Sequence, residues 1–183
     1  MLFRSGAWSL TVNAGARRLY LHVGNGSAYA NNNTINQVAV NVTGNQLIAG
    51  GALPMISDSS QSRSLWGDNN LTCPAPTSQV MVGASYRDTN NGFPSATLSV
   101  TSPANLTSGS NIIPFSEISW TVAAPGSGVP NVISAGAFGG TLTLATVPVN
   151  RFLENCHSFT YANSAVRAAG TYTGRVTYTL VSP

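Results

Sequence analysis

The sequence is poor in charged residues and contains no lysine. Asp, Glu, Lys and Arg make up only 7% of its 183 residues, whereas an average soluble domain has about 25%. Coiled coils and long solvated helices need charged flanks, so neither class fits. The eight basic residues are all arginine, and the net charge is +3. Because these arginines are scattered rather than clustered, we expect no nucleic-acid partner.

Long hydrophobic runs are also missing. A membrane span needs about 18 consecutive apolar residues, and the chain has no such run, so we expect no membrane insertion. The first residues, Met1 to Arg4, lack the apolar stretch of a secretory signal, and we expect a form from which the leader is missing. Disorder does not fit either, because 43% of the residues are hydrophobic.

Ser, Thr and Asn make up roughly a third of the chain, and Val and Gly are also frequent. Apolar and polar residues alternate with the period of two that is typical of half-buried β-strands. Turn-forming residues separate these runs, and neither a linker nor a repeat of fixed period divides the chain. The sequence therefore predicts an all-β protein, an antiparallel β-sandwich in a single domain over residues 1–183. The main alternating runs are residues 8–12, 19–23, 38–42, 80–86, 96–100, 118–122 and 171–180.

Three local features give more detailed expectations. Residues 88–92 end in Asn-Gly, which favours a tight turn, so we read residues 80–86 and 96–100 as two antiparallel strands and their connection. Helical periodicity is nearly absent, and the best candidate for a helical turn is Pro148 to Cys156. Trp8 and Trp120 lie on the apolar faces of their strands and are predicted to belong to the core.

The two cysteines, Cys73 and Cys156, are too far apart for a CxxC redox or zinc motif. A disulfide between them would suit an exported protein, because exported proteins meet oxidising conditions. Two buried free thiols are the alternative. We expect the disulfide, since the composition is that of an exported β-protein.

Residue patterns for catalysis or cofactor binding are absent. The chain has no GxSxG motif, only two histidines, and five carboxylates that mostly stand in turn-like segments. Its glycine-rich stretches lack the GxxxxGK[ST] pattern of phosphate-binding loops. We therefore expect no enzyme, no catalytic residues, no cofactor and no metal site.

One loop segment has the residue types of a sugar-binding surface. Trp66 could stack on a pyranose ring, while Asp68 and Asn69 could hydrogen-bond its hydroxyl groups. The alternative is that Trp66 packs beneath its own loop against the disulfide, as most loop aromatics do. These three residues are the candidate glycan contacts.

The most specific feature is the C-terminal segment, residues 168–181. It begins with Gly170-Thr171-Tyr172, and Tyr172, Val176, Tyr178 and Leu180 then share one face of an alternating run. Together with the two cysteines and the Thr/Ser/Asn-rich composition, this segment resembles the chaperone–usher pilins, which are the subunits of bacterial fimbriae. It is most similar to the alternative and spore-coat-U-like branches of that family.

The resemblance implies an immunoglobulin-like sandwich that lacks its last strand. A periplasmic chaperone fills the open groove first, and an N-terminal strand of another pilus subunit replaces it at an outer-membrane usher. In this chain, Tyr172, Val176, Tyr178 and Leu180 would line the assembly groove. The donor strand would be Trp8, Leu10 and Val12, within an N-terminal donor segment of residues 1–14. The protein would pass through the periplasm to a cell-surface fimbria and contribute to adhesion.

Two departures from the family pattern leave the position in the fibre open. Residues follow the aromatic that often closes pilins, and the N-terminal extension is short. Three alternatives also stay open. The chain could be a carbohydrate-binding module or tip adhesin with a host glycan as ligand, or a β-sandwich structural protein of a phage or virus. Both terminal runs could also be ordinary strands of a complete sandwich.

Overall fold

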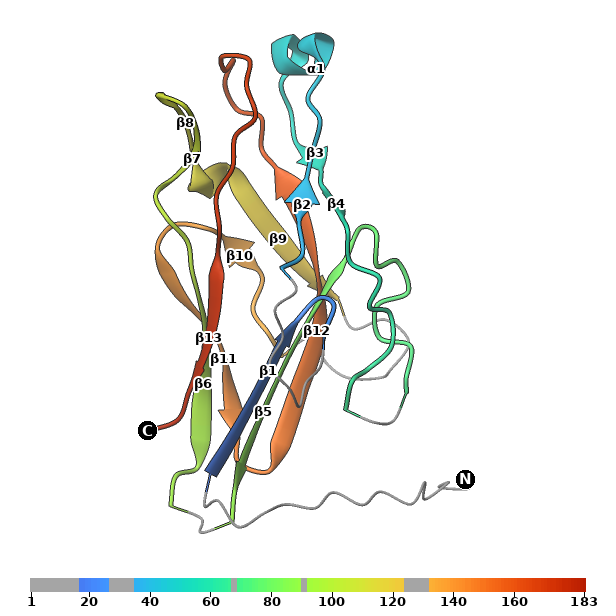
Figure 1. The fold of residues 1–183 in the computed structure, drawn as a ribbon, viewed down its shortest axis with the longest axis vertical. Coiled ribbons are helices and arrows are strands. Elements are labelled where there is room, and N and C mark those ends of the chain that lie inside the picture. Colours follow the sequence, from blue (N-terminus) through green and yellow to red (C-terminus); the bar gives the residue numbers. More distant parts are fainter. Residues whose placement is uncertain (1–16, 27–34, 67–68, 90–91, 124–131) are drawn as a thin grey trace.

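In the computed structural model, the protein is almost entirely β (Figure 1). The structure describes residues 17–26, 35–66, 69–89, 92–123 and 132–183. All pairs of strands in its sheets are antiparallel. The prediction of an all-β, sandwich-like fold is therefore confirmed.

The larger sheet has the strand order β1-β5-β12-β9-β10, and β3 adds a short pairing to β12. Its strands are β1 (Arg17–Val23), β3 (Leu53–Pro54), β5 (Val80–Asp88), β9 (Ile118–Ala123), β10 (Gly136–Ala137) and β12 (Arg151–Tyr161). The smaller sheet has the order β11-β6-β13. Its strands are β6 (Ser95–Thr101), β11 (Thr141–Pro148) and β13 (Thr177–Val181).

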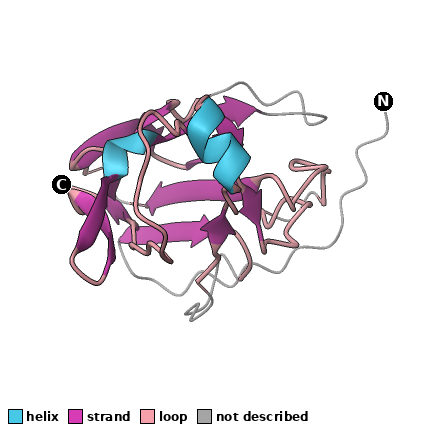
Figure 2. Cartoon of the chain, turned by 90° about the horizontal axis from the view of Figure 1, so that it is seen from above, coloured by secondary structure: helices cyan, strands magenta, loops and turns pink. Residues whose placement is uncertain are grey.

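Short elements complete the fold. Two small ladders are formed by β2 (Val38–Ala39) with β4 (Ile56–Ser57), and by β7 (Asn105–Ser108) with β8 (Asn111–Pro114). The helices are α1 (Gly44–Ala49) and the 3-10 helix η1 (Phe115–Glu117). Figure 2 shows the strands as stacked layers when the molecule is seen from above.

The core lies between the two sheets, where the apolar faces of the alternating strands meet. On β5 and β6 the inward-facing side chains are at most 3% exposed, and they are Val80, Val82, Ala84, Tyr86, Ala96, Leu98 and Val100. An aromatic group that includes Trp120, Phe138 and Phe159 extends this core. Trp120 is only 3% exposed, in agreement with its predicted place, whereas Trp8 lies outside the described residues.

The predicted pairing of residues 80–86 with 96–100 is wrong. β5 pairs with β1 and β12, whereas β6 pairs with β11 and β13, so the connection crosses from one sheet to the other. Both strands have a fully apolar face, and stacking these faces buries more apolar surface than placing the strands side by side. Asp88 helps the chain to turn inward, because its Oδ2 accepts hydrogen bonds from the Tyr86 hydroxyl and the Gly92 N–H.

The predicted helical turn at Pro148 to Cys156 is also wrong. Pro148 ends β11, and Asn150 takes a left-handed conformation with φ 58° before β12 begins at Arg151. Phe152 and Leu153 then pair with consecutive residues of β5 and therefore point to opposite faces of the sheet. A helix would have placed them on one face, as their spacing suggested.

The structure contains the disulfide between Cys73 and Cys156, which confirms the predicted bridge. Cys156 lies in the middle of β12, and Cys73 lies in the segment between β4 and β5, which packs on the outer face of the larger sheet through Trp66 and Thr72. Both cysteines are fully buried with Met81 in a small second core. The bridge therefore fixes this covering segment to the sheet, and it is consistent with an extracellular or periplasmic protein.

Removal of the disulfide should destabilise the fold strongly. The two cysteines are 83 residues apart, and the chain-entropy model gives a loop of this length about 4.5 kcal/mol. We expect the double variant Cys73→Ala, Cys156→Ala to lose most of this amount in urea unfolding. Reduced wild-type protein is the matched control and should behave like the variant. An unchanged free energy of unfolding would show that the bridge contributes nothing.

Candidate functional site at the open side of the sandwich

The last strand occupies an edge of the smaller sheet. β13 pairs with β6, and the described residues include no partner for its other edge. The predicted groove residues Tyr172, Val176, Tyr178 and Leu180 all pack against the core and remain partly exposed. Their neighbours on the other face, including Thr177 and Thr179, are exposed. The structure thus packs all four predicted residues against the core, and Tyr178 and Leu180 share the inward face of β13.

Only the second half of this C-terminal run is a strand. Residues 171–176 cross the β7–β8 hairpin, and in the described part of the chain a bridge between Thr173 and Thr107 is their one β-type pairing with it. Gly174 allows this close crossing, because a Cβ there would clash with Phe115 and Leu106. The two glycines of the Gly-Thr-Tyr-Thr-Gly sequence therefore let the backbone pass close to its neighbours, and neither glycine lies in a strand. β13 proper begins at Thr177.

The first described strand forms the facing edge. β1 pairs with β5 and, among the described residues, with no other strand. β1 and β13 belong to different sheets but lie next to each other on the same side of the sandwich (Figure 1). The two strands therefore line the same side of the sandwich, which we term its open side because inward-facing side chains along it are partly exposed.

Inward-facing residues along this side are not fully covered. Leu19 pairs with fully buried Tyr86 on the same face of the sheet, yet Leu19 itself is 40% exposed. Leu21 and Val23 on β1 are also partly exposed, like the inward row of β13. On the adjacent strands β5 and β6, the corresponding residues are buried. The inward-facing side chains of the core are thus buried on β5 and β6 and partly exposed on β1 and β13.

The ring nitrogens of His157 and the hydroxyl of Tyr178 are buried between β12 and β13. The rings of His157 on β12 and Tyr178 on β13 are 6.2 Å apart, and His157 also stacks on Trp120. Neither nitrogen of His157 nor the Tyr178 hydroxyl has a hydrogen-bond partner among the described residues. Burial lowers the pKa of His157 to about 3 and raises that of Tyr178 well above its ordinary value. Both groups are therefore neutral near pH 7.

The predicted glycan-binding loop packs on the outer face of the larger sheet. The Trp66 ring is partly buried, 5.5 Å from the ring of His22 and 5.7 Å from that of Phe152. Asn69 is exposed and takes a left-handed conformation, with its carbonyl oxygen accepting a hydrogen bond from Arg63. Asp68 lies outside the described residues. Trp66 therefore contacts strands β1 and β12.

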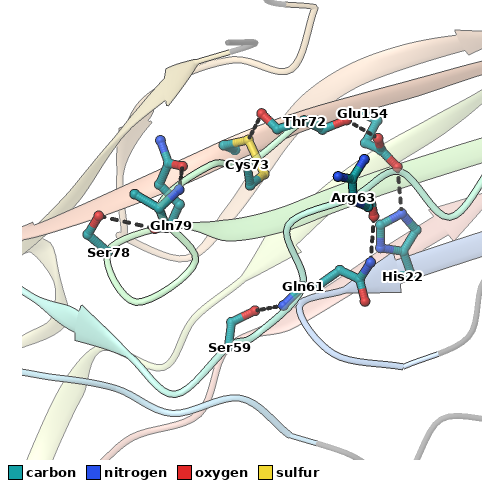
Figure 3. The surroundings of a disulfide bond; sticks show 11 residues. His22, Ser59, Gln61, Arg63, Thr72, Cys73, Ser78, Gln79 and Glu154 are labelled. Atoms are coloured by element: carbon teal, nitrogen blue, oxygen red, sulfur yellow. Dashed lines mark hydrogen bonds and ion pairs between the residues drawn. A yellow bond between two sulfur atoms is a disulfide. The ribbon is translucent and has the colours of Figure 1, made fainter. Parts of the chain in front are cut away.

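Under this loop lies a buried polar cluster (Figure 3). His22 Nε2 is 3.3 Å from Glu154 Oε2, and the Thr72 hydroxyl donates a hydrogen bond to Glu154 Oε1 at 2.9 Å. The two side chains meet across β5 at Gly83, where a Cβ would overlap His22. All members of the cluster are buried, so it holds the loop on the sheet and offers no accessible reactive group.

The sequence singled out one border of the open side but missed the other. Leu19, Leu21 and Val23 were recognised as an alternating strand, and nothing in the sequence shows that this strand lies beside β13. That neighbourhood depends on long-range pairing, which local periodicity does not report. The predicted donor residues Trp8, Leu10 and Val12 lie outside the described residues, so their position relative to the open side is not described.

Other kinds of site find no support in the described part of the chain. There, no group of three or more His, Cys, Asp or Glu side chains could hold a metal ion. In the same residues, no helix is long and apolar enough to cross a bilayer. The chain matches no family model, no curated protein and no solved structure.

The buried neutral histidine gives the fold a specific pH dependence. His157 has a folded pKa of about 3 against 6.5 for an exposed histidine, so between these values the unfolded chain binds one more proton. Stability therefore rises with pH across this window, by about 1.4 kcal/mol per unit from this group, and is constant above it.

The variant His157→Phe keeps the aromatic packing and removes the titration. In urea unfolding between pH 4.5 and 6.5, we expect the difference in free energy of unfolding between the variant and the wild type to grow as the pH falls. Parallel curves for the two proteins would contradict a buried neutral His157.

Proposed function

We propose that this protein is a structural subunit of a cell-surface fibre, assembled when a strand of a neighbouring subunit fills the open side between β1 and β13. The observation that carries the proposal is the exposure of inward-facing side chains along both of these strands. On the interior strands β5 and β6, which are paired on both edges, the corresponding side chains are buried. An added strand would cover Leu19, Leu21, Tyr178 and Leu180.

Strand addition also suits the backbone of this side. An edge strand presents a row of N–H and C=O groups to a partner, and main-chain hydrogen bonds to such an edge give affinity while alternate side chains fill pockets. Charged side chains on edge strands usually prevent pairing with other chains. β13 contains no charged residue, which favours it as the pairing edge, whereas β1 begins with Arg17 and Arg18.

The resemblance of residues 168–181 to chaperone–usher pilins supplies the rest of the proposal. The donor strand is the segment with Trp8, Leu10 and Val12 of another subunit, and a periplasmic chaperone occupies the open side before assembly at an outer-membrane usher. The fimbria then lies outside the cell. The disulfide supports this route, since it needs an oxidising compartment.

A synthetic peptide of residues 6–14 tests the proposal. Mixed with the protein, it should bind the open side and raise the free energy of unfolding, by about 2.7 kcal/mol at a hundred times its dissociation constant. Urea unfolding with and without the peptide measures the effect. The same peptide carrying Leu10→Asp should not stabilise the protein, because a carboxylate would enter the apolar interior.

Two matched protein variants locate the binding. Leu19→Asp places a charge on the inward face of β1, whereas Val181→Asp places one on the outward face of β13, and both residues are substantially exposed. We expect the first variant to lose peptide binding and the second to keep it. Equal binding by both variants, or none by the wild type, would refute strand addition at this side.

A glycan-binding role is a second candidate, favoured by one observation. Phe152 is 41% exposed and its ring lies beside that of Trp66, so two aromatic rings meet on the outer face of the larger sheet. Aromatic faces of this kind can stack on sugars. A glycan array should then show binding that Phe152→Ala weakens while Val181→Ala leaves it intact. An array without signal for the wild type would end this candidate.

A further inference from the structure

Two polar side chains in the interior of the sandwich have no polar partner. His157 on β12 is fully buried, and Tyr178 on β13 has a buried hydroxyl. Among the described residues, neither nitrogen of His157 nor the Tyr178 hydroxyl forms a hydrogen bond. His157 makes ring contacts with Trp120, Phe159 and Tyr178, so its surroundings are aromatic.

Other polar side chains of the same interior are satisfied within the chain. Trp120 donates its indole N–H to a backbone carbonyl oxygen at 2.9 Å, and Asn155 Oδ1 accepts two backbone N–H groups. Buried polar groups of native proteins are nearly always hydrogen-bonded, because an unpaired group loses its bonds to water without a replacement. His157 and Tyr178 therefore lack a partner that the described residues do not supply.

Of these two side chains, Tyr178 is the one that an added strand would meet. β12 is paired with β5 on one edge and β9 on the other, so His157 belongs to an interior strand. β13 has no partner on its second edge among the described residues, and Tyr178 is partly exposed on its inward face. The Tyr178 side chain thus reaches from the open side toward the His157 ring. A side chain on a strand beside β13 would be its cross-strand neighbour, close enough for contact.

The predicted donor strand contains one suitable side chain. Of Trp8, Leu10 and Val12, only Trp8 has a polar atom in its side chain, an indole N–H that can only donate. A tyrosine hydroxyl both accepts and donates, and a neutral imidazole has one acceptor nitrogen. We propose that Trp8 of a neighbouring subunit donates its indole N–H to the Tyr178 hydroxyl, which in turn donates to His157. This inference rests on the proposed strand addition and names the polar contact that the added strand makes.

Such a contact would fix the register of the added strand. A purely apolar row can fit an apolar interior in more than one register, whereas a single buried polar pair favours one. A slip by one residue would turn Trp8 to the outer face. A slip by two residues would move Trp8 away from Tyr178 and leave the hydroxyl unpaired. Tyr178 and His157 thus determine which strand the open side accepts, and in which register.

A double-mutant cycle between peptide and protein tests the proposal. The peptide of residues 6–14 with Trp8→Phe keeps an aromatic ring and lacks the N–H, and titration calorimetry measures its affinity. We expect the loss of affinity caused by Trp8→Phe to be about tenfold larger on the wild-type protein than on the variant Tyr178→Phe. Tyr178→Phe should fold, because it removes only an unpaired group.

The matched control is Tyr172→Phe. Tyr172 also packs against the core, but its hydroxyl already donates to the Ala168 carbonyl oxygen. On this variant, the loss of affinity caused by Trp8→Phe should equal that on the wild type within about twofold.

The outcomes separate this contact from strand addition itself. Coupling of Trp8→Phe to Tyr178→Phe but not to Tyr172→Phe supports the hydrogen bond. Binding of both peptides with the same loss on all three proteins would agree with strand addition and overturn the polar contact. Equal coupling to both tyrosines would assign the effect to packing and also overturn it. No binding of the native peptide to the wild type would refute strand addition, and this inference with it.

Discussion

Face-to-face packing of two alternating strands holds this protein together. β5 and β6 each turn one apolar row inward, and these rows are almost completely buried. Every other strand of the two sheets is placed directly or indirectly by pairing with them: β1 and β12 flank β5, and β11 and β13 flank β6. The same arrangement leaves β1 and β13 as neighbouring edges, where burial is incomplete. The open side is thus a direct consequence of how the core is built.

The outer face of the larger sheet has its own means of stabilisation. A disulfide, a buried cluster of His22, Thr72 and Glu154, and the partly buried Trp66 hold the covering segment in place. Only the absence of a side chain at Gly83 lets His22 reach Glu154 across β5. His22 lies on β1, so these contacts also hold one border of the open side from the outer face of the sheet.

Sequence periodicity predicted the class of fold, and the two cysteines predicted the bridge. The alternation at the C-terminus predicted the inward face of β13, although the strand begins at Thr177 and does not include Tyr172. Long-range pairing was not predictable. Asn91-Gly92 suggested a hairpin, although β5 and β6 stack in different sheets, because local turn chemistry does not report which faces pack together. Phe152 and Leu153 suggested a helix where β12 begins. The sequence did contain the capping box Thr43-Gly44-Asn45-Gln46, which would have identified α1.

The central claim is that β13 has one edge free for an added strand, and amide hydrogen exchange of β13 measures this directly. In an antiparallel pair, successive N–H groups point alternately toward and away from the partner strand. We predict alternating protection along residues 177–181 in the isolated protein, with the unprotected amides becoming protected when the peptide of residues 6–14 is added. Protection of every β13 amide in the isolated protein would mean that both edges are already paired and would contradict the account.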